Sequence, residues 1–202
     1  DELAAEIGGA ERPWVRSVDL SVPGSAADLG RAALEHFGGL DIVVNNAGTN
    51  VTAAQSVHGD DAAARAVFET NVWAPLALTA AVVPAMRAQG SGLIVNVTST
   101  VQAVPLPLLG YYAASKAALA QATRSLRHEL AGTSVNVLEV VPGATDTALR
   151  DVDELPWTGS PPPTFPPVSP ESTAAAIAAF SGGVRAAILD GNVRRVLDAF
   201  LA

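Results

Sequence analysis

A tyrosine and a lysine are the residues of this chain whose types and spacing best fit chemistry. Lys116 is the only lysine in the sequence and follows Tyr112 by four positions. Residues four apart share a helix face, and a compact ammonium group can approach a phenol and a ligand hydroxyl together. A nearby positive charge also lowers the pKa of a phenol toward the range useful for proton donation near neutral pH. The spacing predicts a catalytic Tyr–Lys pair.

The pair needs a helix to position it. Residues 111–130 are rich in alanine and leucine and contain no glycine or proline, which predicts a helix. Tyr112 and Lys116 would then share one face, and Tyr111 would not. A surface lysine beside a half-buried tyrosine would give the same spacing, so other residues must support the pair.

Three apolar runs predict buried strands, and each ends in a polar or glycine cluster. Residues 40–48 stop on two asparagines and a small-residue turn, residues 92–99 end at Ser99, and residues 135–141 precede Pro142 and Gly143. Helical sequence separates the runs, which indicates βαβ units and a parallel sheet. Active groups gather at strand ends in such sheets.

Further helices are predicted at residues 26–37, before the first of these strands, and at residues 61–78 and 80–89, between the first and the second. The second of them contains Asn71. Asparagine is a poor helix former, so a kink at that position would need a specific reason. The alternative is an ordinary mid-helix asparagine.

These motifs occur in the order and at the spacing of the short-chain dehydrogenase/reductase family, which the chain resembles from residue 1 to 147 and more loosely beyond. The residues that carry the resemblance are Asp19, Asn45, Asn46, Ala47, Gly48, Asn71, Ser99, Tyr112, Lys116, Pro142, Gly143 and Thr147. The resemblance implies an α/β fold with a doubly wound, Rossmann-type parallel sheet and helices on both faces. It also implies NAD or NADP as cofactor.

The family's functional residues map onto this chain as follows. The resemblance implies a catalytic set of Asn71, Ser99, Tyr112 and Lys116. It implies cofactor binding by Asp19, Leu20, Asn46, Ala47, Gly48, Tyr112, Lys116, Pro142, Gly143 and Thr147. Hydride would pass between a nicotinamide and a carbonyl or secondary alcohol. Tyr112 would donate the proton, Ser99 would hydrogen-bond the carbonyl oxygen, Lys116 would lower the Tyr112 pKa, and Asn71 would position a water.

Two other functions remain open at this point. One is a catalytically inactive NAD(P)-responsive binding or regulatory protein of the same fold, and the other is a remnant without cofactor. Single residues also have structural alternatives. Asp19 could begin a turn with Ser21 and Gly24, and Pro142 and Gly143 could simply stop a strand.

One family motif is absent, because the sequence contains no T-G-x-x-x-G-x-G loop for the cofactor phosphates. Residues 1–7 are predicted as the helix before the third strand, at residues 14–18, so strands 1 and 2 are not in this chain. Loss of the central first strand would leave neighbouring edges unpaired. We therefore expect a longer gene product, and the choice between NAD and NADP is not decidable from these residues.

Composition favours a single soluble domain covering residues 1–202. The chain is 49% hydrophobic and 16% charged, with a net charge of −8. That charge argues against nucleic acid and anionic membranes as partners. Gly, Pro or charge interrupts the apolar stretches well short of a membrane span, so we expect a cytoplasmic protein. The resemblance implies a homo-oligomer that packs through alanine-rich helix faces, and packing of these faces within one chain is the alternative.

Metal and thiol chemistry have no support in the sequence. The chain has no cysteine, and His36, His58 and His128 lack metal-ligand spacing. We expect these histidines at the surface.

A proline-rich segment predicts the substrate region. Residues 151–170 hold seven prolines and cannot continue a helix or central strand; they resemble the family's variable substrate loop. This segment and residues 101–110 offer apolar side chains near the inferred site, namely Val104, Leu106, Leu108, Leu109, Trp157 and Phe165. They suggest an apolar small-molecule substrate. Beyond them we predict a helix at 170–180, a short strand at 185–189 and a terminal helix at 193–201.

Overall fold

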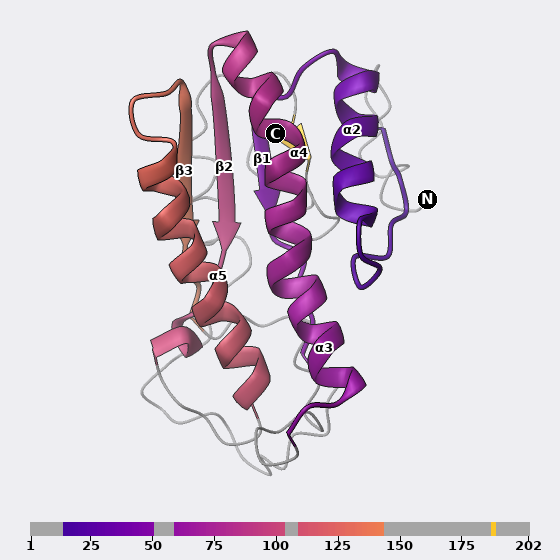
Figure 1. The fold of residues 1–202 in the computed structure, drawn as a ribbon, viewed down its shortest axis with the longest axis vertical. Helices are drawn as coiled ribbons and strands as arrows, with labels where there is room; N and C mark the ends of the chain where they lie inside the picture. The colour runs from indigo at the N-terminus through magenta and orange to yellow at the C-terminus, as the bar shows by residue number, and fades with distance from the viewer. Residues whose placement is uncertain (1–13, 51–58, 104–108, 144–186, 189–202) are drawn as a thin grey trace, which may run out of the picture.

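A parallel β-sheet forms the centre of the molecule. The computed structural model describes residues 14–50, 59–103, 109–143 and 187–188 (Figure 1). The strands are β1 (Ile42–Asn45), β2 (Gly92–Val97), β3 (Val135–Val140) and β4 (Ala187–Ile188), in the order β3-β2-β1-β4. All neighbouring pairs are parallel. The predicted α/β architecture and its three long strands are therefore confirmed.

The strand register brings the predicted motifs to one edge of the sheet. Asn45 pairs with Asn96, and Val97 pairs with Val140. Because the strands are parallel, the residues that follow β1, β2 and β3 leave the sheet at the same side. Ser99 lies two positions beyond the end of β2 at this edge.

Helices cover one face of this sheet in the part of the chain that the structure describes. The helical elements are α2 (Ser25–Phe37), α3 (Ala62–Phe68), the π-helical turn η2 (Glu69–Trp73), α4 (Ala74–Gln89), the 3₁₀ turn η3 (Thr100–Ala103) and α5 (Gly110–Glu129). Figure 1 shows α4 and α5 in front of the strands, with α2 beside α4.

Both faces of the sheet carry buried apolar side chains. On the helical face, Val43 and Ile94 pack with Val82 and Met86 of α4, and all four are 0% exposed. On the opposite face, a second cluster is formed by Ile42, Val44, Val95 and Val97. Near-continuous apolar strands are expected where a parallel sheet is covered on both sides.

A glycine lets α2 approach α4 closely. A methyl group at Gly30 would lie 2.8 Å from Leu78 Cδ1 and 3.1 Å from Val82 Cγ1. These distances are shorter than ordinary carbon contacts. Gly30 therefore sets the spacing of these two helices.

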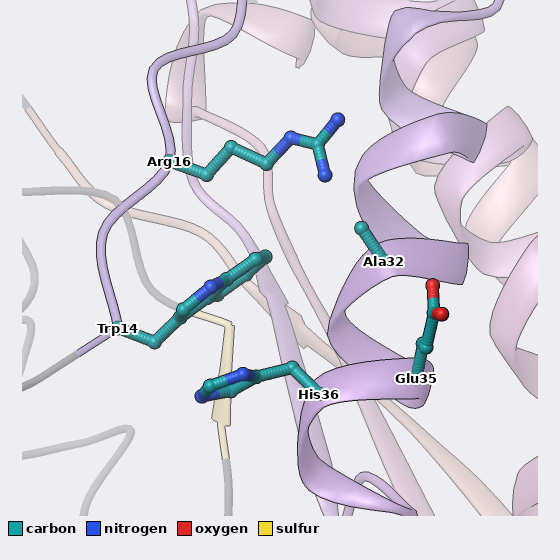
Figure 2. A pocket seen from close by; sticks show the side chains of 5 residues that line it. All are labelled: Trp14, Arg16, Ala32, Glu35 and His36. Carbon is teal, nitrogen blue, oxygen red and sulfur yellow. The ribbon is translucent and has the colours of Figure 1, made fainter.

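The predicted strand at residues 14–18 is wrong, because this segment forms no ladder with another strand. A strand requires a hydrogen-bonded neighbour, so the extended sequence pattern alone is insufficient. Trp14 instead stacks on His36 at a ring separation of 5.2 Å and meets the edge of Phe37 at 5.8 Å. Figure 2 shows the shallow hollow between this segment and α2, lined by Trp14, Arg16, Ala32, Glu35 and His36.

Residues 62–89 form one helical run, which corrects the predicted break between 78 and 80. Thr79 lies inside α4 and is buried, with its hydroxyl accepting a 3.4 Å hydrogen bond from Asn45 Nδ2. Contrary to the expectation that every apolar stretch is short, this run is long and apolar enough to cross a membrane by length and composition. A helix of a packed core passes the same test, and Val82 and Met86 are 0% exposed within this fold.

The strand predicted at residues 185–189 is confirmed as β4, which pairs with β1. Ala187 pairs with Ile42 and Ile188 with Val43. In a doubly wound sheet the strand equivalent to β1 normally pairs with the first strand. The expected unpaired edge of β1 is thus paired with β4. The predicted elements at 1–7, 170–180 and 193–201 lie outside the described residues.

Candidate active site

Lys116 lies in the interior beneath the edge of the sheet. Its side chain comes from the buried face of α5 and the residue is 3% exposed. The Nζ atom donates a 3.0 Å hydrogen bond to the carbonyl oxygen of Val97, the last residue of β2. It also lies 5.9 Å from the centroid of the Tyr112 ring. The helical spacing thus brings the lysine and the tyrosine together.

Ser99 reaches the same phenol from the end of β2. It is 8% exposed, and it lies close enough to Tyr112 to influence the pKa of the phenol. Burial raises the pKa of Tyr112, and the interaction with the Ser99 side chain lowers it by a smaller amount. Removal of water disfavours the phenolate. Burial is thus the dominant influence on this phenol, and the expected lowering of the Tyr112 pKa by Lys116 stays a prediction.

Asn71 is held by three hydrogen bonds inside the fold. The residue is 0% exposed. The backbone N–H of Thr49 donates to Asn71 Oδ1 at 2.8 Å. Asn71 Nδ2 donates to the Thr49 carbonyl and to Ser115 Oγ, each at 2.9 Å. These bonds connect the loop after β1 with α5.

The helix containing Asn71 widens at this residue. Asn71 lies in η2, where the backbone N–H of Ala74 bonds to the Glu69 carbonyl five positions earlier. π-helical turns of this kind occur inside helices, often at functional sites. The inward amide and its three partners give the reason for the irregularity, so the interpretation as an ordinary mid-helix asparagine is wrong.

Gly48 lies against both the lysine and the asparagine. A Cβ atom at this position would lie 3.3 Å from Lys116 Nζ and 3.5 Å from Asn71 Oδ1. Gly48 ends the predicted small-residue turn, and its backbone lies next to the Lys116 ammonium and the Asn71 amide with no side chain of its own between them. A bare backbone surface of this kind fits close approach of a flat ligand.

Asp19 is found in a local turn. Its Oδ1 accepts hydrogen bonds from the N–H of Ser21 at 2.9 Å and from the Ser21 hydroxyl at 2.7 Å. These bonds lower the pKa of the exposed Asp19 carboxyl group. Its hydrogen bonds thus match the alternative of a turn, while Leu20 packs against the core cluster of the helical face. Adenine binding by Asp19 and Leu20 stays a prediction.

The remaining predicted cofactor residues lie at the same sheet edge where they are described. Asn46 and Ala47 follow β1 directly. The Pro142 carbonyl accepts a 2.9 Å hydrogen bond from the N–H of Thr100, which joins the segment after β3 to the residue next to Ser99. Gly143 follows it, and Thr147 lies outside the described residues. The cofactor contacts of these residues stay predictions.

Sequence reasoning missed a chain of buried polar side chains beside this site. Asn45 Nδ2 donates to Asn96 Oδ1 at 2.7 Å, and Asn96 Nδ2 donates to Thr123 Oγ1 at 2.8 Å. Thr123 lies seven residues after Lys116, about two helical turns along the same face. A polar residue within an apolar strand, as at Asn96, is the signal that could have indicated this network.

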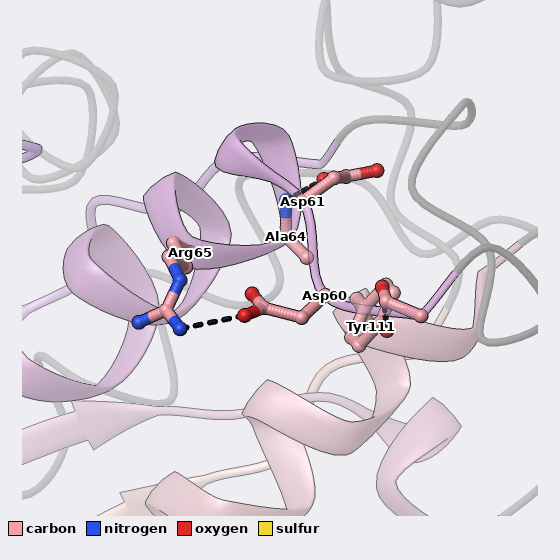
Figure 3. A network of polar contacts seen from close by, with 6 residues as sticks. Asp60, Asp61, Ala64, Arg65 and Tyr111 are labelled. Atoms are coloured by element: carbon pink, nitrogen blue, oxygen red, sulfur yellow. Dashed lines mark hydrogen bonds and ion pairs between the residues drawn. The ribbon is translucent and has the colours of Figure 1, made fainter.

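Tyr111 points elsewhere, as the helical spacing predicted. Its hydroxyl donates a hydrogen bond to the Gly59 carbonyl, before the start of α3 (Figure 3). Asp61 caps α3 by accepting a 2.7 Å bond from the N–H of Ala64, and Arg65 forms a 2.6 Å ion pair with Asp60. Tyr111 thus connects the beginnings of α3 and α5.

The described residues contain no group of three His, Asp or Glu side chains placed to hold a metal ion. His36 and His128 are exposed as predicted, and His58 lies outside the described ranges. None of the four predicted catalytic residues lines the hollow in Figure 2. The predicted substrate segment at 151–170 also lies outside the described part of the chain.

Comparison with known proteins identifies the family. The profile of the short chain dehydrogenase family matches residues 1–155, and the chain belongs to this family. It is 33% identical over 151 residues to an uncharacterized oxidoreductase of Staphylococcus epidermidis, covering 75% of this chain and 64% of that protein. It is 34% identical over 149 residues to 11-beta-hydroxysteroid dehydrogenase 1A of Arabidopsis thaliana, covering 73% of this chain and 42% of that protein. The chain therefore spans less than two thirds of either relative.

A solved structure shares the fold. The short chain dehydrogenase of Burkholderia cenocepacia, crystallised with NADP, is 29% identical to this chain with a TM-score of 0.65. The match covers 92% of this chain and 73% of that protein. This likeness supports the Rossmann-type assignment of the sheet and its helices.

Proposed function

We propose that this protein is an NAD(P)-dependent oxidoreductase that transfers a hydride between a nicotinamide cofactor and a carbonyl or secondary alcohol. The observation that carries the proposal is the convergence of Ser99, Tyr112 and Lys116 at one sheet edge, where Lys116 Nζ lies 5.9 Å from the Tyr112 ring and Ser99 is near enough to lower the pKa of the phenol. Proton donors gathered at one point are what carbonyl reduction requires. Family membership supports the same reaction class.

The chain's own residues fit a nicotinamide nucleotide at this edge. Gly48 places backbone without a side chain of its own beside the Lys116 ammonium. Lys116 and Tyr112 would hold ribose hydroxyls, while Pro142 and Gly143 would border the nicotinamide. The bound nucleotide would supply the hydride. The NADP in the Burkholderia relative supports a nicotinamide cofactor, and the choice between NAD and NADP stays open.

Tyr112 is proposed as the proton donor of the reductive direction. Its pKa is raised by burial, so the phenol is neutral and keeps its proton near neutral pH. Ser99 would hydrogen-bond the substrate carbonyl oxygen and stabilise the negative charge that develops there. Lys116 would place a positive charge near the same oxygen, and Asn71 would orient a water that relays protons toward Lys116.

The substrate is proposed to be a small apolar molecule. The apolar side chains at Val104, Leu106 and Leu108 support this, as does the hydroxysteroid named for the Arabidopsis relative. We also propose a cytoplasmic homo-oligomer without nucleic acid or membrane partners, supported by the net charge of −8 and the alanine-rich helices.

The test compares two neighbouring tyrosines. NADH and NADPH oxidation should be measured with a panel of apolar ketones and aldehydes, and secondary alcohols should be tested with NAD and NADP. Tyr112→Phe should abolish turnover and leave nicotinamide binding intact, whereas Tyr111→Phe should retain turnover. Full activity of Tyr112→Phe would contradict the assignment. Nucleotide binding without turnover by the unsubstituted chain would instead favour the regulatory binding protein.

A further inference from the structure

Ser115 is a buried hydroxyl between two parts of the proposed catalytic group. It lies on α5 and is 0% exposed. Its Oγ donates a 2.7 Å hydrogen bond to the backbone carbonyl of Tyr112 and accepts a 2.9 Å hydrogen bond from Asn71 Nδ2. The side chain therefore connects the π-helical turn with the turn of α5 that carries Tyr112 and Lys116.

The directions of these bonds fix Ser115 as the donor to Tyr112 and the acceptor from Asn71. Its only hydrogen is given to the Tyr112 carbonyl, so its lone pairs face the Asn71 amide. Asn71 Nδ2 uses its two hydrogens for Thr49 and Ser115. The amide oxygen is then directed to the Thr49 N–H and the space beside Gly48, next to Lys116 Nζ.

We infer that Ser115 is a positioning residue, which fixes the place of the Asn71 amide relative to the turn of α5 that carries Tyr112 and Lys116. The inference rests on the proposed function, because it assigns Ser115 an effect on that reaction. Ser115 does not need to touch substrate or cofactor for this effect. Small displacements of catalytic groups lower turnover strongly even when binding is retained.

The same helix offers a matched control. Thr123 is also 0% exposed. Its hydroxyl donates to the Leu119 carbonyl at 2.7 Å and accepts from Asn96 Nδ2 at 2.8 Å. Thr123 therefore repeats the bonding pattern of Ser115, but its asparagine partner is Asn96 and not Asn71. Loss of either hydroxyl leaves one buried asparagine N–H without its partner.

The experiment measures steady-state oxidation of NADPH and NADH by the whole chain, with cyclohexanone and acetophenone among the ketones tested. Ser115→Ala should lower kcat roughly tenfold while KM stays within about twofold, because positioning is lost and binding is kept. Thr123→Val should lose comparable stability in urea and keep kcat within about twofold. An equal fall of kcat in both variants would show a general packing effect and overturn the inference.

A double-mutant cycle tests whether Ser115 acts through Asn71. In an Asn71→Ala background, Ser115→Ala should lower kcat by less than about twofold, because the amide it positions is gone. If the two substitutions multiply their separate effects on kcat, Ser115 acts independently and the inference is wrong.

The outcomes separate this inference from the proposed function. If the unsubstituted chain oxidises neither nucleotide with any ketone tested, the proposed function and the inference fail together. If it is active and Tyr112→Phe is inactive, the proposed function stands. Multiplicative effects of Ser115→Ala and Asn71→Ala would then overturn the positioning role alone.

Discussion

Asn45 and Asn96 face each other across the two central strands, and the Nδ2 atom of Asn45 donates a 2.7 Å hydrogen bond to Oδ1 of Asn96. Both side chains are buried, at 7% and 1% exposure. Asn96 in turn donates to Thr123 on α5. The Asn96 side chain on β2 therefore connects this strand to β1 and to α5, the helix that carries Tyr112 and Lys116.

Asn96→Ala should destabilise the fold, because it leaves Asn45 Nδ2 and Thr123 Oγ1 without this partner. The expected loss is about 1–3 kcal/mol for each buried group left unsatisfied, measured as the free energy of unfolding in urea. Asn136→Ala is the control, since Asn136 is an exposed asparagine on the adjacent strand β3. The control should stay within about 0.5 kcal/mol of the unsubstituted chain. Equal losses in the two variants would contradict the role given to the buried network.

Gly48→Ala should impair catalysis more than stability. The new methyl group would lie 3.3 Å from Lys116 Nζ, which is already held by the Val97 carbonyl at 3.0 Å. Displacement of the ammonium should lower turnover by about tenfold or more. The backbone at Gly48 does not have the positive φ that disfavours alanine, so the unfolding free energy should change by less than about 1 kcal/mol. Unchanged turnover would show that the contact has no catalytic importance.

The pKa of Tyr112 gives an alkaline pH dependence with a defined sign. Burial raises this pKa, so folding favours the neutral phenol. The resulting stability is fully present below the unfolded-state pKa of about 10 and is lost as pH rises through the folded-state pKa. The free energy of unfolding should therefore fall more steeply above about pH 10 in the unsubstituted chain than in Tyr112→Phe.

Spectroscopy can measure the same pKa without activity. The chain has two tyrosines, so Tyr111→Phe leaves Tyr112 as the only phenol. Its tyrosinate absorbance should develop above about pH 10, the ordinary tyrosine value. Ionisation below that value would instead indicate that the charge of Lys116 dominates over burial.

Gly30→Ala should destabilise the protein although alanine favours helices. The added methyl group would lie 2.8 Å from Leu78 and 3.1 Å from Val82. Overpacking of this kind costs about 1–3 kcal/mol, against a gain in helix propensity of at most about 1 kcal/mol. Glu35→Ala, at an exposed position of α2, should change the unfolding free energy by less than about 0.5 kcal/mol. A stabilised Gly30→Ala variant would show that α2 moves away from α4 without cost.

Local sequence patterns predicted much of the fold. The apolar runs predicted β1, β2 and β3 because each strand buries side chains on both faces. Alanine and leucine predicted α5, and helical spacing placed Tyr112 and Lys116 together. These features depend on residues that are near one another in the chain, so periodicity and residue type were sufficient.

Other elements depended on partners that the local pattern does not contain. Residues 14–18 have a strand-like pattern but form no ladder, because a strand exists only beside a hydrogen-bonded neighbour. The break predicted near Thr79 is wrong, because Thr79 lies on the buried side of α4, where Asn45, distant in sequence, donates a hydrogen bond to its hydroxyl. The pairing of β4 with β1 likewise joins residues far apart in the chain.

For the candidate site, the sequence by itself determined the chemical groups, and the tertiary structure decided their environment. A serine, a tyrosine and a lysine can be recognised from type and spacing alone. The direction of the Tyr112 pKa shift depends on burial, and the link from Asn71 through Ser115 to Tyr112 depends on two helices meeting. Desolvation and hydrogen bonding both require the packed neighbours, which are set only when the whole chain folds.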